Sequence, residues 1–280
     1  MAVTGHSDQR PPLDAQVLAD EIGLTPDLRL ELLPESASTN QVAADRAREG
    51  APDGLLVVAD HQTAGRGRLD RTWETPPGAA VTFSLLLRPT VPASAWPWLP
   101  LLTGHTVAKA ITSFGYDAKV KWPNDVLIPT TGSGQATWKK VAGILVERIE
   151  TDAGPAAVVG VGINVTTDAE ELPVPTATSL ALAHDDRTPT REGVLLGVVA
   201  AVREGYDAWQ AGGPEAAARL ASSYVAHCAT VGQDVRVDLP GGTSLSGRAV
   251  DVDLDGRLVV ETADGVEKVG AGDVVHVVPE

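Results

Sequence analysis

After residue 230 the pattern of the chain changes. Short stretches in which apolar and polar residues alternate occur at 234–239, 243–252, 257–261 and 265–269. The turns between them contain Pro240-Gly241-Gly242, Asp255-Gly256 and Asp264-Gly265. Aspartate–glycine pairs between alternating segments are the strongest short-range signal for a β-hairpin. Residues 230–280 are therefore predicted to form a small β-domain built as a meander.

Before residue 230, apolar runs typical of buried strands alternate with helical patterns. Strands are expected at 55–59, 79–87, 119–120, 141–149 and 156–165. Helices are expected at 13–22, 41–50, 99–113, 192–209 and 215–228. A turn at 152–155 should join the last two strands, and the polar stretch 129–137 is expected to be a mobile loop. We divide this part into an N-terminal lead with a short helix, 1–35, and a larger domain, 36–229.

The composition is that of a soluble globular chain. With 280 residues, 43% hydrophobic and 21% charged, the protein can bury a sizeable core. No apolar run is long enough to span a bilayer, and no secretory signal is evident, so we expect a cytoplasmic protein with no membrane partner. The single cysteine, Cys228, excludes an intramolecular disulfide framework. The formal net charge of −15 argues against non-specific binding of nucleic acid.

Against this acidic background, one segment is rich in glycine and arginine. Residues 61–78, HQTAGRGRLDRTWETPPG, place Arg66, Arg68 and Arg71 within six positions. Glycine lets backbone N–H groups approach a ligand, and guanidinium groups bind phosphate oxygens bidentately. The pattern indicates an oxyanion- or phosphate-binding loop, although a solvated basic surface loop has the same composition.

Two lysine-containing segments lie at the ends of predicted strands. In Lys121-Trp122-Pro123-Asn124-Asp125, Lys121 is a candidate phosphate contact, and Asn124 or Asp125 a candidate nucleotide or metal contact. The alternative is structural, with a packed tryptophan followed by a turn. In KKVAGIL, Lys139 or Lys140 would present a flexible cation at the edge of the sheet.

Two further motifs combine small and polar residues. Gly160 and Gly162 lie inside a predicted strand, where glycine is unfavourable, so something is expected to pack close to the backbone there. Ser38-Thr39-Asn40 precedes a helical pattern, and these residue types are preferred helix N-caps. A helix N-terminus of this kind also binds anions or polar ligand groups.

These segments resemble, in order and spacing, those of the biotin–protein ligases. The resemblance covers roughly residues 36–280, and the QTAGRGR and KWPND segments are its most specific parts. It implies a two-step reaction: biotin and ATP, with Mg²⁺, give biotinyl-5′-adenylate and pyrophosphate. One lysine of a biotin carboxyl carrier domain of an acyl-CoA carboxylase then takes the biotin.

The resemblance also implies roles for individual residues. The expected biotin contacts are Ser38, Thr39, Asn40, Gln62, Arg66, Gly67, Arg68 and Lys140. The expected nucleotide contacts are Arg71, Trp73 and Asn164, to which the residue types of Lys121 and Asn124 add those two. The expected catalytic cations are Lys140, Arg68, Arg66 and Lys121, which would neutralise charge as a carboxylate attacks the α-phosphate. The long loop before Lys139 leaves the choice between the two lysines open, with the neighbouring VAGIL segment favouring Lys140.

The fold implied is α+β: a mixed, largely antiparallel sheet with helices, as in class II synthetases and biotin ligases, plus an SH3-like β-barrel. The nearest enzymatic rival is a lipoate–protein ligase or octanoyltransferase. A biotin-sensing transcriptional regulator is disfavoured, because the lead is too short for a helix-turn-helix domain and the chain is acidic. A third alternative is an inactive biotin-binding scaffold, which turnover would exclude.

Overall fold

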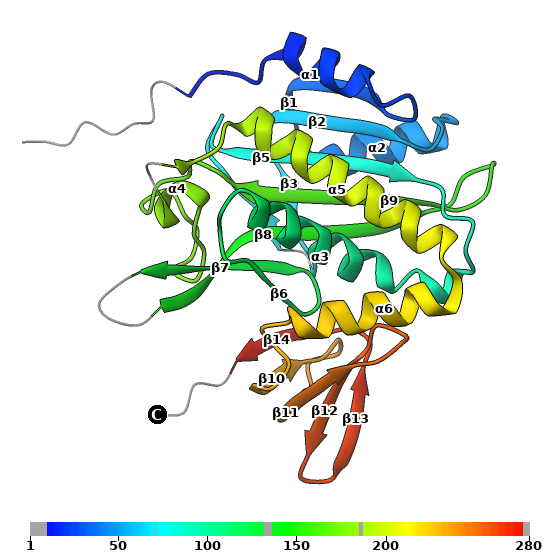
Figure 1. Ribbon diagram of the computed structural model, residues 1–280, viewed down its shortest axis with the longest axis vertical. Coiled ribbons are helices and arrows are strands. Elements are labelled where there is room, and N and C mark those ends of the chain that lie inside the picture. Colours follow the sequence, from blue (N-terminus) through cyan, green and yellow to red (C-terminus); the bar gives the residue numbers. More distant parts are fainter. Residues whose placement is uncertain (1–9, 70, 132–135, 185–186, 277–280) are drawn as a thin grey trace, which may run out of the picture. The chain divides into compact units, whose positions relative to one another are not determined.

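The computed structural model describes residues 10–69, 71–131, 136–184 and 187–276 (Figure 1). The chain forms two compact units. The first contains Met1–Arg88 and Pro129–Gly197, and the second contains Pro89–Ile128 and Val198–Glu280.

The first unit is built around a mixed sheet. Its strands lie in the order β1 (Arg29–Ser36), β2 (Leu55–Gln62), β5 (Ala80–Leu87), β9 (Ala156–Asn164), β8 (Ala136–Ile149). The β1–β2 pair is parallel, while β2–β5, β5–β9 and β8–β9 are antiparallel. This confirms the expected mixed, largely antiparallel sheet. The two central strands, β5 and β9, are buried along their whole length, which explains their continuous apolar sequences.

Strand β1 is absent from the sequence prediction, which placed its residues in the lead. None of its eight residues is fully buried, so the segment RLELLPES has no apolar run to mark it. It is fixed by seven residue pairs with β2, from Arg29–Leu55 to Ser36–Gln62. Helix α1 (Ala15–Gly23) precedes it, and the Asp14 side chain caps that helix by accepting hydrogen bonds from the Gln16 and Val17 amides.

Helix α2 (Thr39–Arg48) packs against the sheet through small side chains. Ala43, Ala44 and Ala47 are buried against a cluster that includes Val57 and Val158. Alanine at this spacing lets the helix axis approach the strands closely, and the N-terminus of the helix is held near the middle of β5 and β9. After β9, residues 165–179 lead to the short helix α4 (Leu180–Ala183).

The region predicted as a loop at 129–137 is largely strand. Strand β7 (Asp125–Thr131) extends into it from one side, and β8 begins at Ala136 on the other. The prediction was wrong for these flanks, because threonine and proline near a strand end resemble loop sequence. The rest of the predicted loop, residues 132–135, lies outside the described residues.

The second unit contains three helical segments and two groups of strands. The helices are α3 (Trp98–Ser113), α6 (Gly213–Ala226) and the part of α5 (Arg191–Ala211) after Gly197, with a 3₁₀ turn at Ala93–Ala95. Strand β6 (Lys119–Lys121) forms an antiparallel hairpin with β7, whose last residues belong to the first unit.

The C-terminal meander forms an antiparallel sheet in the order β13-β12-β11-β10-β14. Its strands are β10 (Asp234–Asp238), β11 (Ser244–Val252), β12 (Leu258–Thr262), β13 (Gly265–Val269) and β14 (Asp273–His276). The first four were predicted, with the turn glycines Gly241, Gly242 and Gly256 in left-handed conformation. Strand β14 was not predicted, and no β13–β14 pairing closes a barrel among the residues described.

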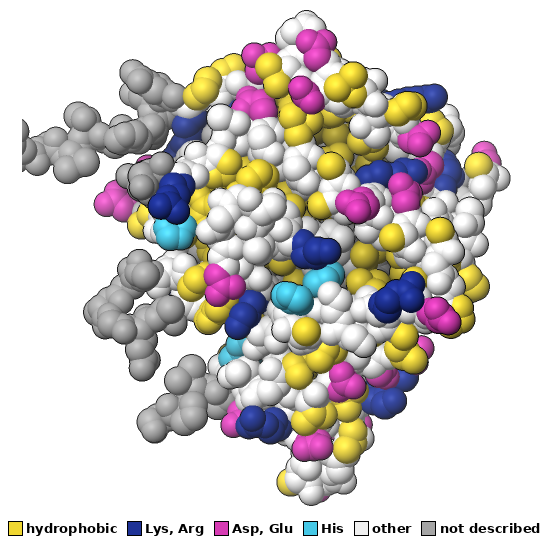
Figure 2. Space-filling view, viewed as in Figure 1, with side chains coloured by type: hydrophobic (Ala, Val, Ile, Leu, Met, Phe, Trp, Pro, Cys, Tyr) yellow, Lys and Arg dark blue, Asp and Glu magenta, His cyan; other side chains and the backbone are white. Residues whose placement is uncertain are grey.

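Within the described residues, no helix is long and apolar enough to cross a membrane. On the face shown in Figure 2, acidic and basic side chains are scattered rather than gathered by sign.

Candidate functional site

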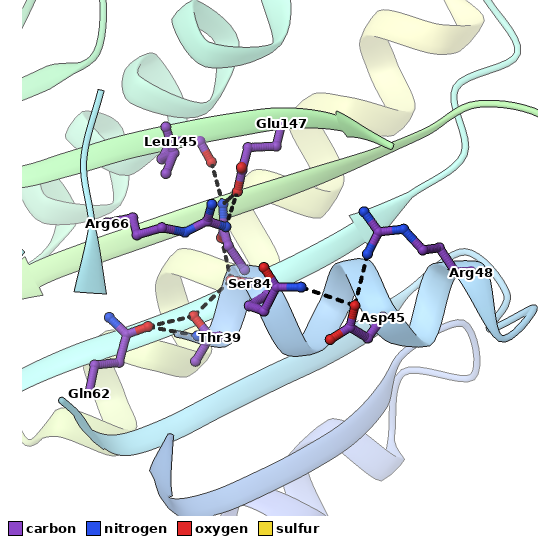
Figure 3. A network of polar contacts seen from close by, with 10 residues as sticks. Thr39, Asp45, Arg48, Gln62, Arg66, Ser84, Leu145 and Glu147 are labelled. Atoms are coloured by element: carbon purple, nitrogen blue, oxygen red, sulfur yellow. Dashed lines mark hydrogen bonds and ion pairs between the residues drawn. The ribbon is translucent and has the colours of Figure 1, made fainter. Parts of the chain in front are cut away.

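The N-terminus of α2 is the centre of a buried polar network in the first unit (Figure 3). The Thr39 amide donates a 2.8 Å hydrogen bond to Gln62 Oε1 at the end of β2. Ser84 Oγ, in the middle of β5, lies 2.8 Å from Thr39 Oγ1 and 2.5 Å from Asn40 Oδ1. Asn40 Nδ2 donates to Glu147 Oε2 at 2.7 Å and to the Leu145 carbonyl at 3.3 Å, both on β8. The network therefore joins three strands, β2, β5 and β8, to a helix.

Both polar atoms of the Asn40 side chain have hydrogen-bond partners. Its Oδ1 can only accept, so the single hydroxyl proton of Ser84 goes to it. Both protons of the Asn40 amide nitrogen have acceptors on β8. Thr39 Oγ1 can then share its own proton between Gln62 Oε1, 3.0 Å away, and Ser84 Oγ. A fully satisfied buried network of this kind fixes the position of its side chains.

Arg66 closes the network from the glycine/arginine segment. Its Nη2 atom lies 2.8 Å from Glu147 Oε2, the same oxygen that accepts from Asn40. Arg66 is on β3 (Gly65–Arg66), which pairs with β4 (Thr72–Trp73) in a short hairpin. Glu147 thus places one arginine of the expected ligand loop beside the N-terminus of α2.

Gly160, Gly162 and Gly143 form a strip of bare backbone on β9 and β8, covered by Asn40 and Trp73, which we call the glycine trough. A Cβ at Gly160 would collide with the Asn40 amide, and one at Gly162 would lie 2.5 Å from Trp73 Cε2. Residues two apart on a strand share a face, so Asn40 and Trp73 lie on the same side of the sheet. Gly143, which pairs with Gly162, would place a Cβ 3.2 Å from Trp73 Cζ3. The close approach predicted at Gly160 and Gly162 is confirmed.

Trp73 occupies this trough with an unsatisfied donor. Its indole Nε1 is buried and has no hydrogen-bond partner among the described residues. A buried N–H without an acceptor is costly and uncommon, and it indicates space for a polar partner. The trough is therefore lined by a polar network at one end and an indole at the other.

The two lysines of the KKVAGIL segment have different surroundings. Lys140 Nζ lies 5.7 Å from the centre of the Trp73 ring and faces the glycine trough. The Lys140 amide donates to Thr176 O at 2.9 Å, and its carbonyl accepts from the Thr178 amide at 2.8 Å. Lys139 instead lines a separate cavity of about 540 Å³ with Thr130, Thr137 and residues of the 169–182 segment. Of the two, Lys140 is the lysine at the trough.

The hairpin tip between β3 and β4 contains Arg68 and Arg71. The Gly67 amide donates to the Arg71 carbonyl at 2.6 Å, and the Arg71 amide donates to Arg68 O at 3.2 Å. Leu69 has a φ of 54°, a left-handed conformation that is unfavourable for a branched side chain, and it is 55% exposed. Strained backbone of this kind is found most often at ligand-binding and active sites.

Ser38 and Asn164 complete the predicted residues in the first unit. Ser38 is at the N-cap position of α2 and is buried, but its side chain makes no capping hydrogen bond. Asn164, at the end of β9, is 5% exposed and donates from Nδ2 to Thr178 O at 3.0 Å. It therefore supports the same residues that pair with Lys140.

Lys121 and Asn124 belong to the second unit and are described with it. Lys121 ends β6, and Asn124 lies in the turn before β7. Between them, Trp122 is buried, and its indole donates to the Gly256 carbonyl at 3.1 Å, as the structural alternative for this tryptophan predicts. Burial, together with the positive charge of Lys121, lowers the pKa of His276 to about 4.

Sequence reasoning missed Ser84, Glu147 and Gly143. Each lies within an apolar strand, and each acquires its role only through the register of β5, β8 and β9. A signal was present for Glu147, because it is a carboxylate in an otherwise apolar strand segment.

Comparison with known proteins identifies the family to which the chain belongs. Residues 33–164 match the Biotin/lipoate A/B protein ligase family, and residues 230–277 match the Biotin protein ligase C terminal domain. The chain is 39% identical to the biotin–[acetyl-CoA-carboxylase] ligase of Mycobacterium tuberculosis over 98% of this chain and 99% of that protein. It is 35% identical to the bifunctional ligase/repressor BirA of Bacillus subtilis, over 85% of this chain and 71% of that protein.

The solved structures agree. The biotin protein ligase of Aquifex aeolicus in complex with biotin and ATP matches with a TM-score of 0.71 and 28% identity, over 88% of this chain and 97% of that one. The biotin protein ligase of Leishmania major in complex with biotinyl-5-AMP matches with a TM-score of 0.57, at the level of fold. With its mixed sheet, its C-terminal β-domain and these relatives, the chain belongs to the biotin protein ligase family.

Proposed function

We propose that this protein activates biotin with ATP and transfers it to one lysine of a biotin carrier domain in an acyl-CoA carboxylase. The observation that carries the proposal is the glycine trough between the Thr39–Asn40 network and Lys140. Such a trough suits a narrow ligand with a polar ring at one end and a carboxylate at the other. Biotin has this shape, and the family relationship supports it.

The polar network is the proposed site for the ureido ring of biotin. Thr39, Asn40 and Gln62 carry both donors and acceptors, the two kinds of group that a cyclic urea needs, and would exchange present partners for it. The Ser38 hydroxyl, which makes no capping hydrogen bond, adds another. Arg66, Gly67 and Arg68 would cover the ligand from the hairpin. The floor of Gly160 and Gly162 lets the ligand lie against the backbone.

Lys140 is proposed to act at the carboxylate end. In the first step a biotin carboxylate oxygen attacks the α-phosphorus of ATP, the bond to the β-phosphate oxygen breaks, and pyrophosphate leaves. Two anionic groups must approach, so Lys140, Arg66, Arg68 and Lys121 are the proposed neutralising cations. The attacking nucleophile belongs to the substrate, and the protein supplies orientation and charge.

In the second step the neutral amine of the carrier lysine attacks the acyl carbon. The acyl–phosphate bond breaks, AMP leaves with the electron pair, and the amine loses a proton to form the amide. The adenylate must be shielded from water until then. The hairpin tip around Leu69 is the proposed cover, and Trp73 must leave the floor at Gly162 to admit the ligand. Arg71, Trp73, Lys121, Asn124 and Asn164 are the proposed nucleotide contacts.

Mg²⁺ is proposed to accompany ATP. No group of three acidic, histidine or cysteine side chains that could hold a metal occurs within the described part of the chain. Magnesium in nucleotide-dependent enzymes is bound mainly by phosphates, waters and one or two carboxylates. The residues therefore fit an ion carried by the triphosphate, and it would supply charge neutralisation there.

Carrier identity, cytoplasmic location, the lack of a DNA-binding role and the division at residues 36 and 230 stay predictions from the sequence. A lipoate ligase is the rival within the same broad family.

The test mixes the protein with ATP, Mg²⁺ and biotin, and follows pyrophosphate release and adenylate by mass spectrometry. Lipoate and octanoate are run in parallel. Biotin-dependent adenylate, followed by biotinylation of a purified carrier domain, is the expected result. Adenylate with lipoate alone would overturn the proposal in favour of the rival ligase, and biotin binding without turnover would leave a sensor or scaffold.

A further inference from the structure

A short N-terminal strap, residues 10–14, is bound to the sheet-end segment that follows β9. The Arg10 guanidinium forms a two-pronged pair with Glu171: Nη1 to Oε1 at 3.1 Å and Nη2 to Oε2 at 2.7 Å. Nη2 also donates to the Thr166 carbonyl at 2.8 Å. The Arg10 side chain is 10% exposed and the Glu171 side chain 20%, so this pair is screened less than a surface pair.

The charge state of Glu171 agrees with this geometry. Hydrogen bonds from Arg10 hold the pKa of the Glu171 carboxyl below its ordinary value, against the opposing effect of burial. Glu171 also accepts from the Asp168 amide at 2.9 Å, so it organises its own turn as well as binding Arg10. The backbone of Arg10 packs on Gly78, where a Cβ would come within 2.8 Å of Arg10 Cβ.

A second tie fixes the strap to the sheet itself. Arg191, at the start of α5 and 7% exposed, donates to the Pro11 carbonyl at 2.6 Å and pairs with Asp60 at 2.8 Å. Asp60 in turn accepts from the Leu13 amide at 3.0 Å. These contacts attach the strap to β2 and thereby hold the backbone next to Arg10 in place.

The segment that Arg10 holds leads directly to Lys140. Residues 165–179 begin beside Ala79, where the Val165 and Thr166 amides donate to its carbonyl, and end with Thr176 and Thr178 bonded to the Lys140 backbone. Within the described structure, the buried hydroxyls of Thr166 and Thr167 have no hydrogen-bond partner. At this end of the segment, residues 166–171 are held by the hydrogen bonds of Arg10 to Thr166 and Glu171 and by the bond from the Asp168 amide to Glu171.

We infer that Arg10 is a positioning residue for biotin activation. By holding residues 166–171 through Glu171, it sets the position of residues 176–178 and, through them, of Lys140. The inference rests on the function proposed above for Lys140. Arg10 lies ahead of the region matched to the Biotin/lipoate A/B protein ligase family, residues 33–164, and Glu171 lies after it.

The test uses Arg10→Gln, Glu171→Gln and the double variant in the full-length chain, with Arg10→Lys as the milder change. Arg46→Gln is the control, because Arg46 also forms a bidentate pair, from Nε and Nη2 to Glu31 at 2.9 and 2.8 Å, elsewhere in the first unit. Two quantities are measured: adenylate formation with ATP and biotin, and hydrogen exchange of peptides covering residues 139–145 and 174–180 without ligand.

Arg10→Gln and Glu171→Gln should each lower the rate of adenylate formation about tenfold, the size expected when a positioning contact is lost. The double variant should be no worse than either single one, because both remove the same contact. Exchange at the Lys140 and Thr178 amides should rise in these variants and stay at the wild-type level in Arg46→Gln. Arg10→Lys should restore part of both quantities.

Wild-type exchange at these amides in Arg10→Gln would overturn the inference, as would faster exchange with an unchanged rate of adenylate formation. A lower melting temperature alone, matched by Arg46→Gln, would show a merely structural role and overturn it too. If the wild-type protein makes no biotinyl adenylate, the proposed function fails, while the exchange comparison still decides whether Arg10 positions the Lys140 backbone.

Discussion

The indole of Trp73 lies on Gly162, where a Cβ atom would come within 2.5 Å of Cε2 and 2.7 Å of Cζ2. Gly143 pairs with Gly162 across β8 and β9 and lies beneath the same ring. The paired strands β8 and β9 therefore both have glycine, which has no side chain, at this point of the sheet. The space so created holds an indole whose N–H has no acceptor among the residues described. We expect this strip of glycine to be the floor against which the proposed ligand lies.

Gly162→Ala tests whether this floor matters. The added methyl group must displace the indole or strain β9, and overpacking of this kind costs about 1–3 kcal/mol in the free energy of unfolding. We expect that loss in urea unfolding, together with weaker biotin binding by calorimetry. Gly23→Ala is the matched control, since nothing lies within 4 Å of a Cβ at that helical position. Unchanged stability and unchanged biotin affinity in Gly162→Ala would contradict the assignment of the floor.

Lys140→Ala should leave a folded protein that has lost most of its adenylate synthesis. Removing a preorganised charge that stabilises a transition state typically costs about 10²–10³ in rate. Lys139→Ala is the matched control. It removes the same charge from the neighbouring position, and Lys139 lines a different cavity. Pyrophosphate release separates the two variants. Wild-type release by Lys140→Ala, or equal losses in both variants, would refute the role of Lys140.

Glu147 should be needed for biotin binding although it was not predicted from the sequence. Glu147→Leu removes the acceptor shared by Asn40 and Arg66, leaving a buried amide donor that costs about 1–3 kcal/mol. We expect the dissociation constant for biotin to rise about tenfold, since tenfold corresponds to about 1.4 kcal/mol. Glu147→Gln keeps an acceptor for Asn40 and should cost less. Calorimetric titration with biotin measures both, and equal affinities in the two variants would argue against the network.

Arg68→Ala should loosen the hold on the reaction intermediate. Arg68 lies in the hairpin tip whose neighbour Leu69 is in left-handed conformation, so this segment is suited to closing over a bound adenylate. The expected signs are free biotinyl adenylate released into solution or a weaker affinity for biotin. Mass spectrometry of the filtrate after one turnover detects the first. A variant that shows neither effect would remove Arg68 from the proposed site.

The sequence predicted those parts of the fold that depend on local pattern. The apolar runs of β5 and β9 and the Asp-Gly turns of the C-terminal domain were marked clearly, because burial on both faces and left-handed turns each restrict residue choice. Strands β1 and β14 were missed. They lie at the edges of their sheets, where pairing with a neighbour and not apolar sequence defines the strand.

The candidate site shows the same difference between residues marked by local sequence pattern and residues defined by contacts between distant segments. Gly160 and Gly162 were recognised because glycine inside a strand is unfavourable without a reason. Ser84 carried no signal in the sequence, and Glu147 only that of a carboxylate in an apolar segment, because their contacts with Asn40 depend on the register of the strands and on where α2 docks. Arg10 also lies far in sequence from its partner Glu171, and only the folded chain brings them together.

Acid should destabilise the second unit in a pH range set by two histidines. Burial, reinforced by electrostatic interaction with His227 and Lys109, lowers the pKa of His105 to about 4, and burial with the charge of Lys121 lowers that of His276 to about 4. Both rings are neutral in the folded state, whereas in the unfolded chain they take up protons below about pH 6.5. These histidines therefore do not reduce the free energy of unfolding above about pH 6.5. They lower it progressively as the pH drops from about 6.5 towards 4.

The expected loss is at most about 3 kcal/mol for each histidine, and less for His276, which is more accessible than His105. Urea unfolding at pH 7.5, 5.5 and 4.5 measures it, and His105→Gln and His276→Gln should each flatten the decline between pH 6.5 and 4.5. The carboxyl of Glu171, whose pKa is lowered, adds its own loss only at more acidic pH, so the range separates the two causes. A decline that is equally steep in the double histidine variant would show that other groups control the acid sensitivity.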